Sequence, residues 1–372
     1  MSDQSSVIHF NHAGASPSPT SVIQKVVDHM YLEQRLGGYA AAEDSMEEVA
    51  QVYERTANLL HATSAMEIAL VESSTVAWTR LFYAMVEYHE RLRKGNDTKK
   101  TILISEAEYA AQVVAAQKFA AEHKGWNVVA LPSALHDDGT STGMVDIVAL
   151  KSMLKGTYKV LGEPLDPKSI TMVCVTHIPT NSGIINPVQE IGELLQKWNS
   201  NAFYLVDACQ SVGQMEVNVK TMRCHGLCGT GRKFLRAPRG TGFLYVDEAV
   251  VSLLEPSHID HACAPIQRVP SYTSDYVDVE YSFREGAKRF EFWESSAAAK
   301  LGFGEALRFA MDNAGDMNEI SEKIHSIVME LQELLQAIPG VEIYYPGSKS
   351  GIVTFTTDRL EADQLKKYLW EA

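Results

Sequence analysis

The sequence lacks the features of a nucleic-acid-binding or membrane-spanning protein. It has no run of five or more Lys and Arg residues, and no apolar run approaches the roughly 20 residues that cross a bilayer. Lys and Arg number 33 against 47 Asp and Glu, and this net charge of -14 would repel a phosphate backbone. The first residues lack the basic and then apolar order of a secretory signal. We therefore predict a cytoplasmic protein that binds neither nucleic acid nor membranes.

Cysteine is also scarce, with five residues in a chain of 372. An odd number of cysteines in a long chain argues against a disulfide scaffold, so we expect reduced thiols. Cys224 and Cys228 have no second metal-type pair, and we expect no metal site. What is present is ordinary for a globular protein: hydrophobic residues make up 45% and charged residues 22%. The length supports roughly two domains.

Short apolar runs alternate with helical stretches between Met66 and Val246. Such runs are typical of strands buried on both faces, and intervening helices indicate right-handed crossovers. The runs cover residues 68–71, 101–104, 126–130, 170–175, 203–206 and 242–246. They predict an α/β fold with a large, mostly parallel sheet.

The pattern changes on either side of this region. Beyond Pro256 it predicts a polar loop at 264–280, helices at about 294–313 and 316–338, and short strands near 341–344 and 352–355. We therefore predict an N-terminal segment over residues 1–40, a large α/β domain over 41–255 and a small α+β domain over 256–372.

Two residues in the second half of the large domain have a shared chemical interpretation. Asp207 follows the apolar run 203–206, where an open parallel sheet binds ligands, and Lys233 lies 26 residues later. A lysine can form a Schiff base with a carbonyl cofactor, a carboxylate can keep a pyridine nitrogen protonated, and Thr and Arg can bind phosphate. These are the requirements of pyridoxal 5'-phosphate. The alternative is that Asp207 caps a helix and that Lys233 and Arg236 form a solvated basic edge.

A family resemblance favours the first interpretation. The segments Val206–Ser211 and Thr230–Gly242 closely resemble the class V aminotransferase and cysteine-desulfurase-like group of fold-type I pyridoxal-phosphate enzymes. Supporting motifs occur at 11–14, 37–39 and 289–291, so the resemblance extends from residue 8 to about 310. Within that group the sequence is most similar to isopenicillin-N-epimerase-like proteins and to the sulfoxide lyases of ergothioneine-type pathways. The resemblance implies a homodimer whose N-terminal segment covers the active site.

The resemblance implies three roles at the centre of the site. Lys233 is the Schiff-base lysine, which also moves the Cα proton of the substrate. Asp207 contacts the pyridine nitrogen and keeps the ring an electron sink. Gln210 donates a hydrogen bond to the phenolic oxygen of the cofactor, unless it is only an amide at the start of a helix.

The remaining cofactor contacts are implied in the same way. Ser74 and Thr75 open a helix whose N-terminus would bind the phosphate, although the same residue types also act as simple helix caps. Thr230 and Arg232 add a second side to the phosphate site.

Tyr109 takes the place of a histidine that stacks on the ring in the family, unless it is a core tyrosine. Thr180 and Asn181 compete for a contact with the phenolic oxygen, and Asn181 is favoured.

On the substrate side, the resemblance implies contacts from His12, a candidate acid or base, and from Tyr39. A lone histidine in a turn can equally be an ordinary surface residue. The family normally binds the substrate carboxylate with an arginine on a strand after the final helix, and this sequence ends before that strand. Either the sequence is shortened or another arginine serves, with Arg239, Arg284 and Arg289 as the candidates.

The absence of a late cysteine shapes the predicted reaction. Desulfurases of this group attack substrate sulfur with a cysteine near the C-terminus, and no cysteine follows Cys263. We therefore predict a C–S lyase acting on a cysteine-derived conjugate or its sulfoxide, by β-elimination through aldimine, quinonoid and aminoacrylate intermediates. An epimerase or aminotransferase shares the early steps and is the first alternative. A non-catalytic binding subunit with the same fold is the second.

Overall fold

The computed structural model describes residues 8–93, 98–199, 201–272, 277–313 and 317–371. The chain divides into two compact units, each assembled from separate stretches of sequence. Unit 1 comprises residues 1–94, 217–220 and 224–314, and unit 2 comprises residues 95–216, 221–223 and 315–372. The domain boundaries expected from the sequence remain a prediction.

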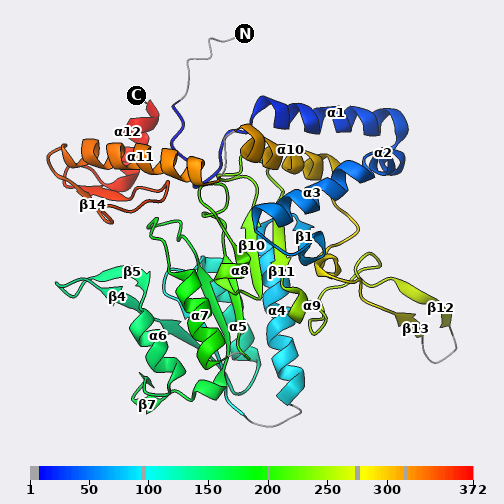
Figure 1. Cartoon of the computed structure of the whole chain (residues 1–372), viewed down its shortest axis with the longest axis horizontal. Helices are drawn as coiled ribbons and strands as arrows, with labels where there is room; N and C mark the ends of the chain where they lie inside the picture. The colour runs from blue at the N-terminus through cyan, green and yellow to red at the C-terminus, as the bar shows by residue number, and fades with distance from the viewer. Residues whose placement is uncertain (1–7, 94–97, 200, 273–276, 314–316, 372) are drawn as a thin grey trace. The chain divides into compact units, whose positions relative to one another are not determined.

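Unit 1 combines a helical layer with a short antiparallel sheet. The long helices are amphipathic, and α1 packs on α10, which packs on α3 (Figure 1). The elements are α1 (Thr20–Leu36), α2 (Gly38–Asp44), α3 (Met46–Leu59), η1 (Ala65–Glu67), β1 (Ile68–Val71), α4 (Ser74–Arg93), β10 (Gly226–Thr230), β11 (Gly242–Val246), α9 (Glu248–Val251), β12 (Ile266–Tyr272), β13 (Val277–Tyr281), η3 (Ala287–Phe290) and α10 (Ala297–Asn313).

The register of the sheet in unit 1 brings three chain segments to one edge. Strand β11 pairs antiparallel with both β1 and β10, and Gly242 at its start is opposite Val71 on one side and Thr230 on the other. The last residues of β1 and β10 therefore lie together. From this edge the chain continues to the first turn of α4 and to the segment that contains Lys233.

Unit 2 is built around four parallel strands in the order β9-β8-β2-β3. Helix α5 packs on β3 and α7 packs on β9 (Figure 1). The elements are β2 (Lys100–Ser105), α5 (Ala110–Glu122), β3 (Trp126–Leu131), β4 (Ser133–Leu135), β5 (Ser141–Val145), α6 (Ile147–Leu154), β6 (Lys159–Val160), β7 (Glu163–Pro164), η2 (Pro167–Ser169), β8 (Ile170–Thr176), α7 (Val188–Trp198), β9 (Phe203–Asp207), α11 (Met317–Gln336), β14 (Val341–Ile343), β15 (Phe355–Thr357) and α12 (Ala362–Glu371). Helix α8 (Val219–Met222) contributes residues to both units.

The predicted α/β class with a mostly parallel sheet is confirmed. All six apolar runs form strands, and every residue of β8 and β9 is buried. Strand β10 of the sheet in unit 1 was not predicted: it has the sequence Gly-Leu-Cys-Gly-Thr, whose two glycines obscure the apolar pattern.

Two expectations for the C-terminal third were wrong. The predicted polar loop at 264–280 contains a two-stranded antiparallel sheet, β12 and β13, in which Arg268 forms an ion pair with Glu280. Charged residues on both strands suit a hairpin exposed to solvent, which lacks the apolar signal of a core strand. The strand expected at 352–355 begins at Phe355 instead and pairs with β14.

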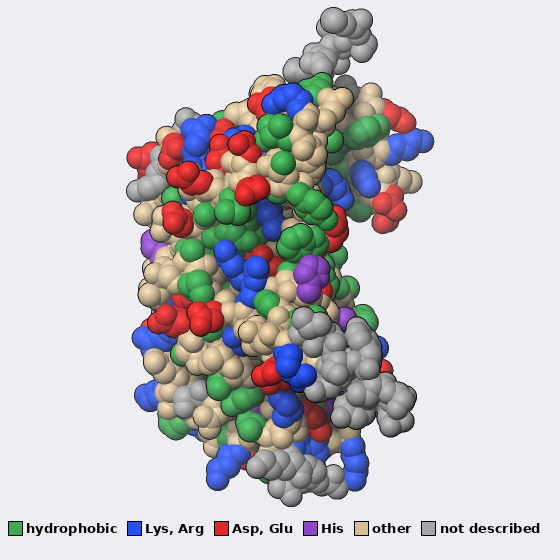
Figure 2. Space-filling model, turned by 90° about the vertical axis from the view of Figure 1, so that its right-hand side faces the viewer, with side chains coloured by type: hydrophobic (Ala, Val, Ile, Leu, Met, Phe, Trp, Pro, Cys, Tyr) green, Lys and Arg blue, Asp and Glu red, His purple; other side chains and the backbone are tan. Residues whose placement is uncertain are grey.

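Acidic and basic side chains are interspersed on the face drawn in Figure 2. Within the described residues, no helix is long and apolar enough to cross a membrane.

Replacing Gly242 by alanine should destabilise the protein. A Cβ at this position would lie 2.6 Å from the carbonyl carbon of Ser73, so the backbone at the start of α4 would have to move. We expect a loss of about 1–3 kcal/mol in the free energy of unfolding, measured by urea denaturation. Gly38→Ala is the control, because nothing lies within 4 Å of the added methyl group. Equal losses in both variants would contradict the predicted close approach.

Candidate active site

In unit 1, Lys233 lies in a closed turn directly after β10. Two backbone bonds tie the beginning of the turn: Gly231 N donates to Thr241 O at 3.0 Å, and Ala237 N donates to Gly231 O at 2.8 Å. A third bond, from Arg236 N to Lys233 O at 2.9 Å, closes the turn over the lysine itself. Lys233 is only partly buried. The backbone therefore holds this lysine at a fixed, accessible point at the sheet edge.

The start of α4 offers an unused hydroxyl group. Ser73 Oγ accepts a bond from Val76 N at 3.2 Å, so Ser73 fills the capping role. Ser74 is 7% exposed, and its Oγ has no hydrogen-bond partner among the residues that the structure describes. Thr75 is exposed. A buried, unpartnered hydroxyl beside free helix N–H groups suits an anion such as phosphate.

Thr230 and Arg232 flank the lysine and bond to neighbouring backbone. The Thr230 hydroxyl is buried and donates to Thr241 O at 3.2 Å. The Arg232 guanidinium donates to Gly14 O, and Arg232 O accepts from Ser16 N at 2.9 Å. Arg232 therefore ties the N-terminal segment to the lysine turn. The predicted phosphate contacts of both residues remain predictions.

His12 lies in this N-terminal segment, with its ring 4.9 Å from the ring of His9 in an edge-to-face arrangement. Burial lowers the pKa of His12 below its usual value, and the charges of His9 and Arg236 act in the same direction. A lowered pKa leaves the imidazole neutral near pH 7 and able to accept a proton. Tyr39 is 80% exposed, and its ring lies 6.4 Å from that of Trp293.

In unit 2, Asp207 ends β9 with a buried carboxylate. Its Oδ1 accepts from Cys209 N at 2.8 Å, and its Oδ2 accepts from Gln112 Nε2 on α5. Gln112 was not among the site residues predicted from the sequence. One sequence signal could have identified it. Gln112 lies in the first turn of the helix that follows Tyr109, and the start of this helix is near the carboxyl ends of the strands. Each Asp207 oxygen thus accepts a hydrogen bond.

Gln210 lies beyond Asp207, and its Nε2 donates to Thr180 Oγ1. The side chain of Thr180, rather than that of Asn181, therefore contacts Gln210. Asn181 is exposed, and its backbone carbonyl accepts from Thr354 Oγ1 at 3.1 Å. The side chains of Thr180 and Asn181 both remain candidates for a contact with the phenolic oxygen of the cofactor.

A C-terminal segment, residues 348–354, secures the turn that contains Asn181. The hydroxyls of Ser348 and Ser350 both donate to Gly183 O, at 2.8 and 2.6 Å. Gly183 has φ +71°, and an added Cβ would lie within 2.9 Å of Ile352 atoms, so only glycine fits. Nothing in the local sequence signals these contacts.

Tyr109 immediately precedes α5, and its side chain is 57% exposed. It is not a core tyrosine. Its backbone carbonyl accepts from Gln112 N at 2.9 Å, which places it one turn from the residue that bonds Asp207. Its position fits a ring that covers a ligand at this strand end.

The candidate arginines differ in their surroundings. Arg289 is buried and donates to Arg284 O, Val251 O and Leu254 O at 3.0–3.1 Å. Its guanidinium is thus largely engaged by backbone, whereas Arg239 is exposed. A carboxylate contact from Arg239, Arg284 or Arg289 remains a prediction, and this structure favours Arg239 over Arg289.

The five cysteines are free thiols, as expected. Cys174 and Cys224 are buried, and burial raises the pKa of each thiol well above its usual value. Burial also raises the pKa of Cys263. In the described parts of the chain, no group of three or more His, Cys, Asp and Glu residues is arranged to hold a metal ion.

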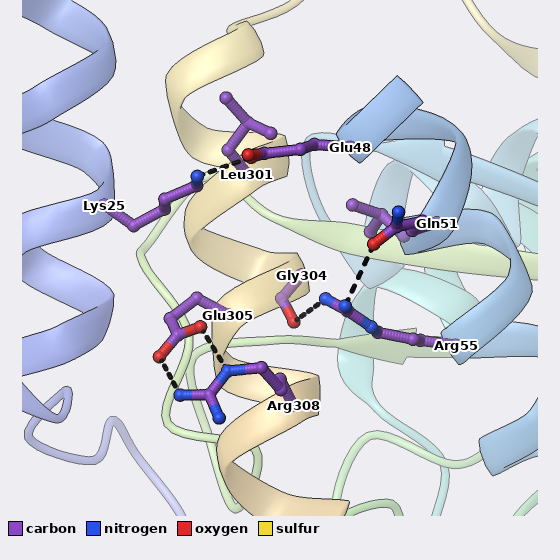
Figure 3. A pocket seen from close by; sticks show the side chains of 9 residues that line it. Lys25, Glu48, Gln51, Arg55, Leu301, Gly304, Glu305 and Arg308 are labelled. Atoms are coloured by element: carbon purple, nitrogen blue, oxygen red, sulfur yellow. Dashed lines mark hydrogen bonds and ion pairs between the residues drawn. The ribbon is translucent and has the colours of Figure 1, made fainter. Parts of the chain in front are cut away.

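A separate cavity of about 300 Å³ lies in unit 1 among α1, α3 and α10 (Figure 3). Its charged groups bond to one another: Lys25 to Glu48, and Arg308 to Glu305 at 2.7 Å. Arg55 bonds to Gly304 O and Gln51 Oε1, at 3.2 and 3.1 Å. None of the predicted cofactor residues lines this cavity, so it is distinct from the lysine turn.

Replacing Arg232 by alanine should loosen the N-terminal segment. The variant loses the charged donor to Gly14 O, and a bond of this kind contributes about 1.5 kcal/mol or more. We expect amide hydrogen exchange in residues 11–17 to accelerate roughly tenfold or more, measured by mass spectrometry. The control is Arg239→Ala. Arg239 is an exposed residue in the segment between β10 and β11 that also contains Arg232, and its replacement should leave the exchange of residues 11–17 unchanged. Unchanged exchange in Arg232→Ala would show that the contact does not hold the segment.

Comparison with known proteins places the chain in a family. The model of the class-V aminotransferase family matches residues 8–372. A cysteine desulfurase from Serratia proteamaculans is 26% identical over 364 residues, which cover 97% of this chain and 80% of the relative. A probable cysteine desulfurase from Halalkalibacterium halodurans is 24% identical, covering 95% and 78%.

Solved structures agree on the fold. The apo cysteine desulfurase from Thermococcus onnurineus NA1 superposes with a TM-score of 0.77 at 22% identity, covering 98% of this chain and 82% of that one. The cystine C–S lyase C-DES, in complex with cysteine persulfide, gives 0.78 at 20% identity, covering 98% and 87%. A C-DES mutant has glycine covalently linked to its pyridoxal-phosphate cofactor. The expected fold is thereby confirmed, and the chain belongs to the class V aminotransferase family.

Proposed function

We propose that the chain is a pyridoxal-phosphate-dependent lyase that cleaves the C–S bond of a cysteine-derived conjugate or its sulfoxide. The observation that carries the proposal is Lys233, held in its closed turn after β10 in a chain of this family. The names of its relatives and structural neighbours, cysteine desulfurase and cystine C–S lyase, support sulfur-containing amino acids as the substrate class.

The residues of each unit fit the cofactor. In unit 1, the buried Ser74 hydroxyl without a partner suits a phosphate oxygen, with Thr75, Thr230 and Arg232 as further candidates. In unit 2, the buried Asp207 carboxylate accepts two hydrogen bonds and suits a protonated ring nitrogen. When bound, the cofactor supplies an electron sink for the negative charge that develops at the substrate Cα.

The proposed reaction uses the chain's own groups for proton handling. Lys233 Nζ removes the Cα proton, the electron pair of that bond forms a Cα–Cβ double bond, and the Cβ–S bond breaks with its pair going to sulfur. With the cofactor bound, Asp207 would hold the ring nitrogen, Tyr109 would cover a ring face and Gln210 would contact the phenolic oxygen. His12, Tyr39 and Arg239 are proposed substrate contacts.

Elimination of this kind needs no thiolate from the enzyme. The raised pKa values of Cys174, Cys224 and Cys263 keep these thiols protonated near pH 7, which weakens them as nucleophiles. Their chemistry therefore supports elimination over transfer of sulfur to one of these three cysteines.

We also propose that the chain acts as a cytoplasmic homodimer, which rests on the family resemblance. Light scattering after gel filtration should give twice the mass of one chain, 41.1 kDa. A monomeric mass at micromolar concentration would contradict this part of the proposal.

The loaded protein should absorb visible light and release pyruvate and ammonia from a cysteine S-oxide conjugate, but not from L-alanine. Lys233→Ala should lower this rate by about 10³-fold or more, since it removes both the covalent anchor and the proton carrier. The exposed Lys168 provides the matched control, and Lys168→Ala should retain full activity. The measurements are an absorbance spectrum and a coupled pyruvate assay.

The products distinguish the alternatives. Alanine formed from L-cysteine would indicate a desulfurase. Visible absorbance without pyruvate from any sulfur substrate would indicate an epimerase or aminotransferase, while a protein that never takes up the cofactor would indicate a non-catalytic relative.

A further inference from the structure

A second carboxylate lies close to Asp207 in unit 2 and has no part in the proposed reaction. Glu108, in the turn between β2 and α5, accepts bonds from Ser105 Oγ and from both the backbone N and the hydroxyl of Thr176. The hydroxyl bond measures 2.6 Å. One carboxylate thus accepts three hydrogen bonds from the ends of the adjacent strands β2 and β8. This set of bonds fixes the position of the Glu108 side chain.

Thr176 connects this arrangement to Asp207. The two residues are directly opposite in the parallel pairing of β8 and β9, and the next residue, His177, donates its N–H to Asp207 O at 2.9 Å. Glu108 thus holds the backbone and side chain of the residue beside Asp207. The two carboxylates also repel each other, because each lies in the other's field at a poorly solvated strand end.

We propose that Glu108 is a positioning residue for Asp207. Its carboxylate fixes Thr176 beside Asp207, and its negative charge strengthens the attraction of Asp207 for a cationic ring nitrogen. This inference rests on the proposed function, because it concerns the group that Asp207 is proposed to bind.

The charge on Glu108 changes within the physiological range. Burial raises the pKa of Glu108 to about 7 and the charge of Asp207 acts in the same direction, while the bonds from Ser105 and Thr176 oppose the shift. Below that pH the carboxyl group is neutral, and one of its oxygens becomes a donor. Its support for Asp207 is therefore weaker in acid and stronger in base.

Burial sets the charge state of two other titratable groups near Glu108. Burial lowers the pKa of His177 to about 4, so the imidazole is neutral near pH 7. Burial raises the pKa of the Cys174 thiol, which stays protonated. Glu106 accepts from Ser133 N and Oγ on the other side of the turn, and the phenol of Tyr109 is exposed.

The first test uses the protein without cofactor. A carboxyl group whose pKa is raised by folding stabilises the protein fully below its usual value of 4.5, and this contribution is lost as the pH rises through about 7. Relative to Glu108→Gln, the wild type should therefore lose stability between pH 5 and pH 8, measured as the urea midpoint. Glu106→Gln, a matched change in the same turn, should follow the wild type. In a double-mutant cycle at pH 8, Glu108→Gln and Asp207→Asn should be non-additive.

The second test uses the protein loaded with pyridoxal phosphate. Removing a negative charge near the ring disfavours its protonated form, so in Glu108→Gln the pH midpoint at which the visible band disappears should fall by about 0.3–1 unit. Glu108→Asp should restore part of the shift, and Glu106→Gln should cause none. Should Glu108→Gln not fold, Thr176→Val removes one donor to Glu108, and the pH-dependent loss of stability should move to higher pH.

The outcomes separate this inference from the proposed function. A wild type that takes up no cofactor refutes the proposed function, while the cycle in the cofactor-free protein still decides whether Glu108 and Asp207 are coupled. Additive effects in that cycle, or a coloured protein whose pH midpoint is unmoved by Glu108→Gln, would overturn the inference.

Discussion

The carboxylate of Asp207, buried at the end of β9, is the constraint on which the proposed site in unit 2 depends. A buried charge is costly unless donors compensate it, and here a backbone N–H and the amide of Gln112 supply the compensation. The parallel pairing of β8 and β9 supplies the position, because it sets Thr176 opposite Asp207. The helix α5 then contributes Gln112 from one turn beyond the strand end. The hydrogen-bond donors, the strand register and the placement of α5 thus all act on the carboxylate of Asp207.

In unit 1, the sheet brings Lys233 and the buried Ser74 hydroxyl at the start of α4 to one edge. Gly242 allows β11 to approach the start of α4 closely, and Gly231 allows the lysine turn to pack on Thr241 and Ala237. Backbone bonds close the turn around Lys233, and the hydroxyls of Thr230 and Thr241 add bonds to Thr241 O and Pro238 O. None of these bonds uses the side chain of Lys233.

The thiol chemistry and the proposed elimination are consistent with each other. Buried cysteines are weak nucleophiles because an apolar surrounding disfavours the thiolate. A lyase that expels sulfur through a carbon–carbon double bond needs only a base at Cα and an electron sink. Lys233 is the base that we propose, and Asp207 is the residue that we propose to support the electron sink.

The sequence by itself determined the strands buried on both faces, since continuous apolar runs are incompatible with solvent exposure on either side. It also located Asp207 at a strand end and Lys233 in a glycine-flanked turn, because these signals are local. The hairpin of β12 and β13 and the strand β10 escaped it, as charge and glycine mask their pattern. Only the tertiary structure decided that Gln112 reaches Asp207, that Glu108 holds Thr176, and that Ser348 and Ser350 secure the turn at Gly183. These contacts join residues 68 to 167 positions apart, and no local pattern encodes which distant segment packs against which.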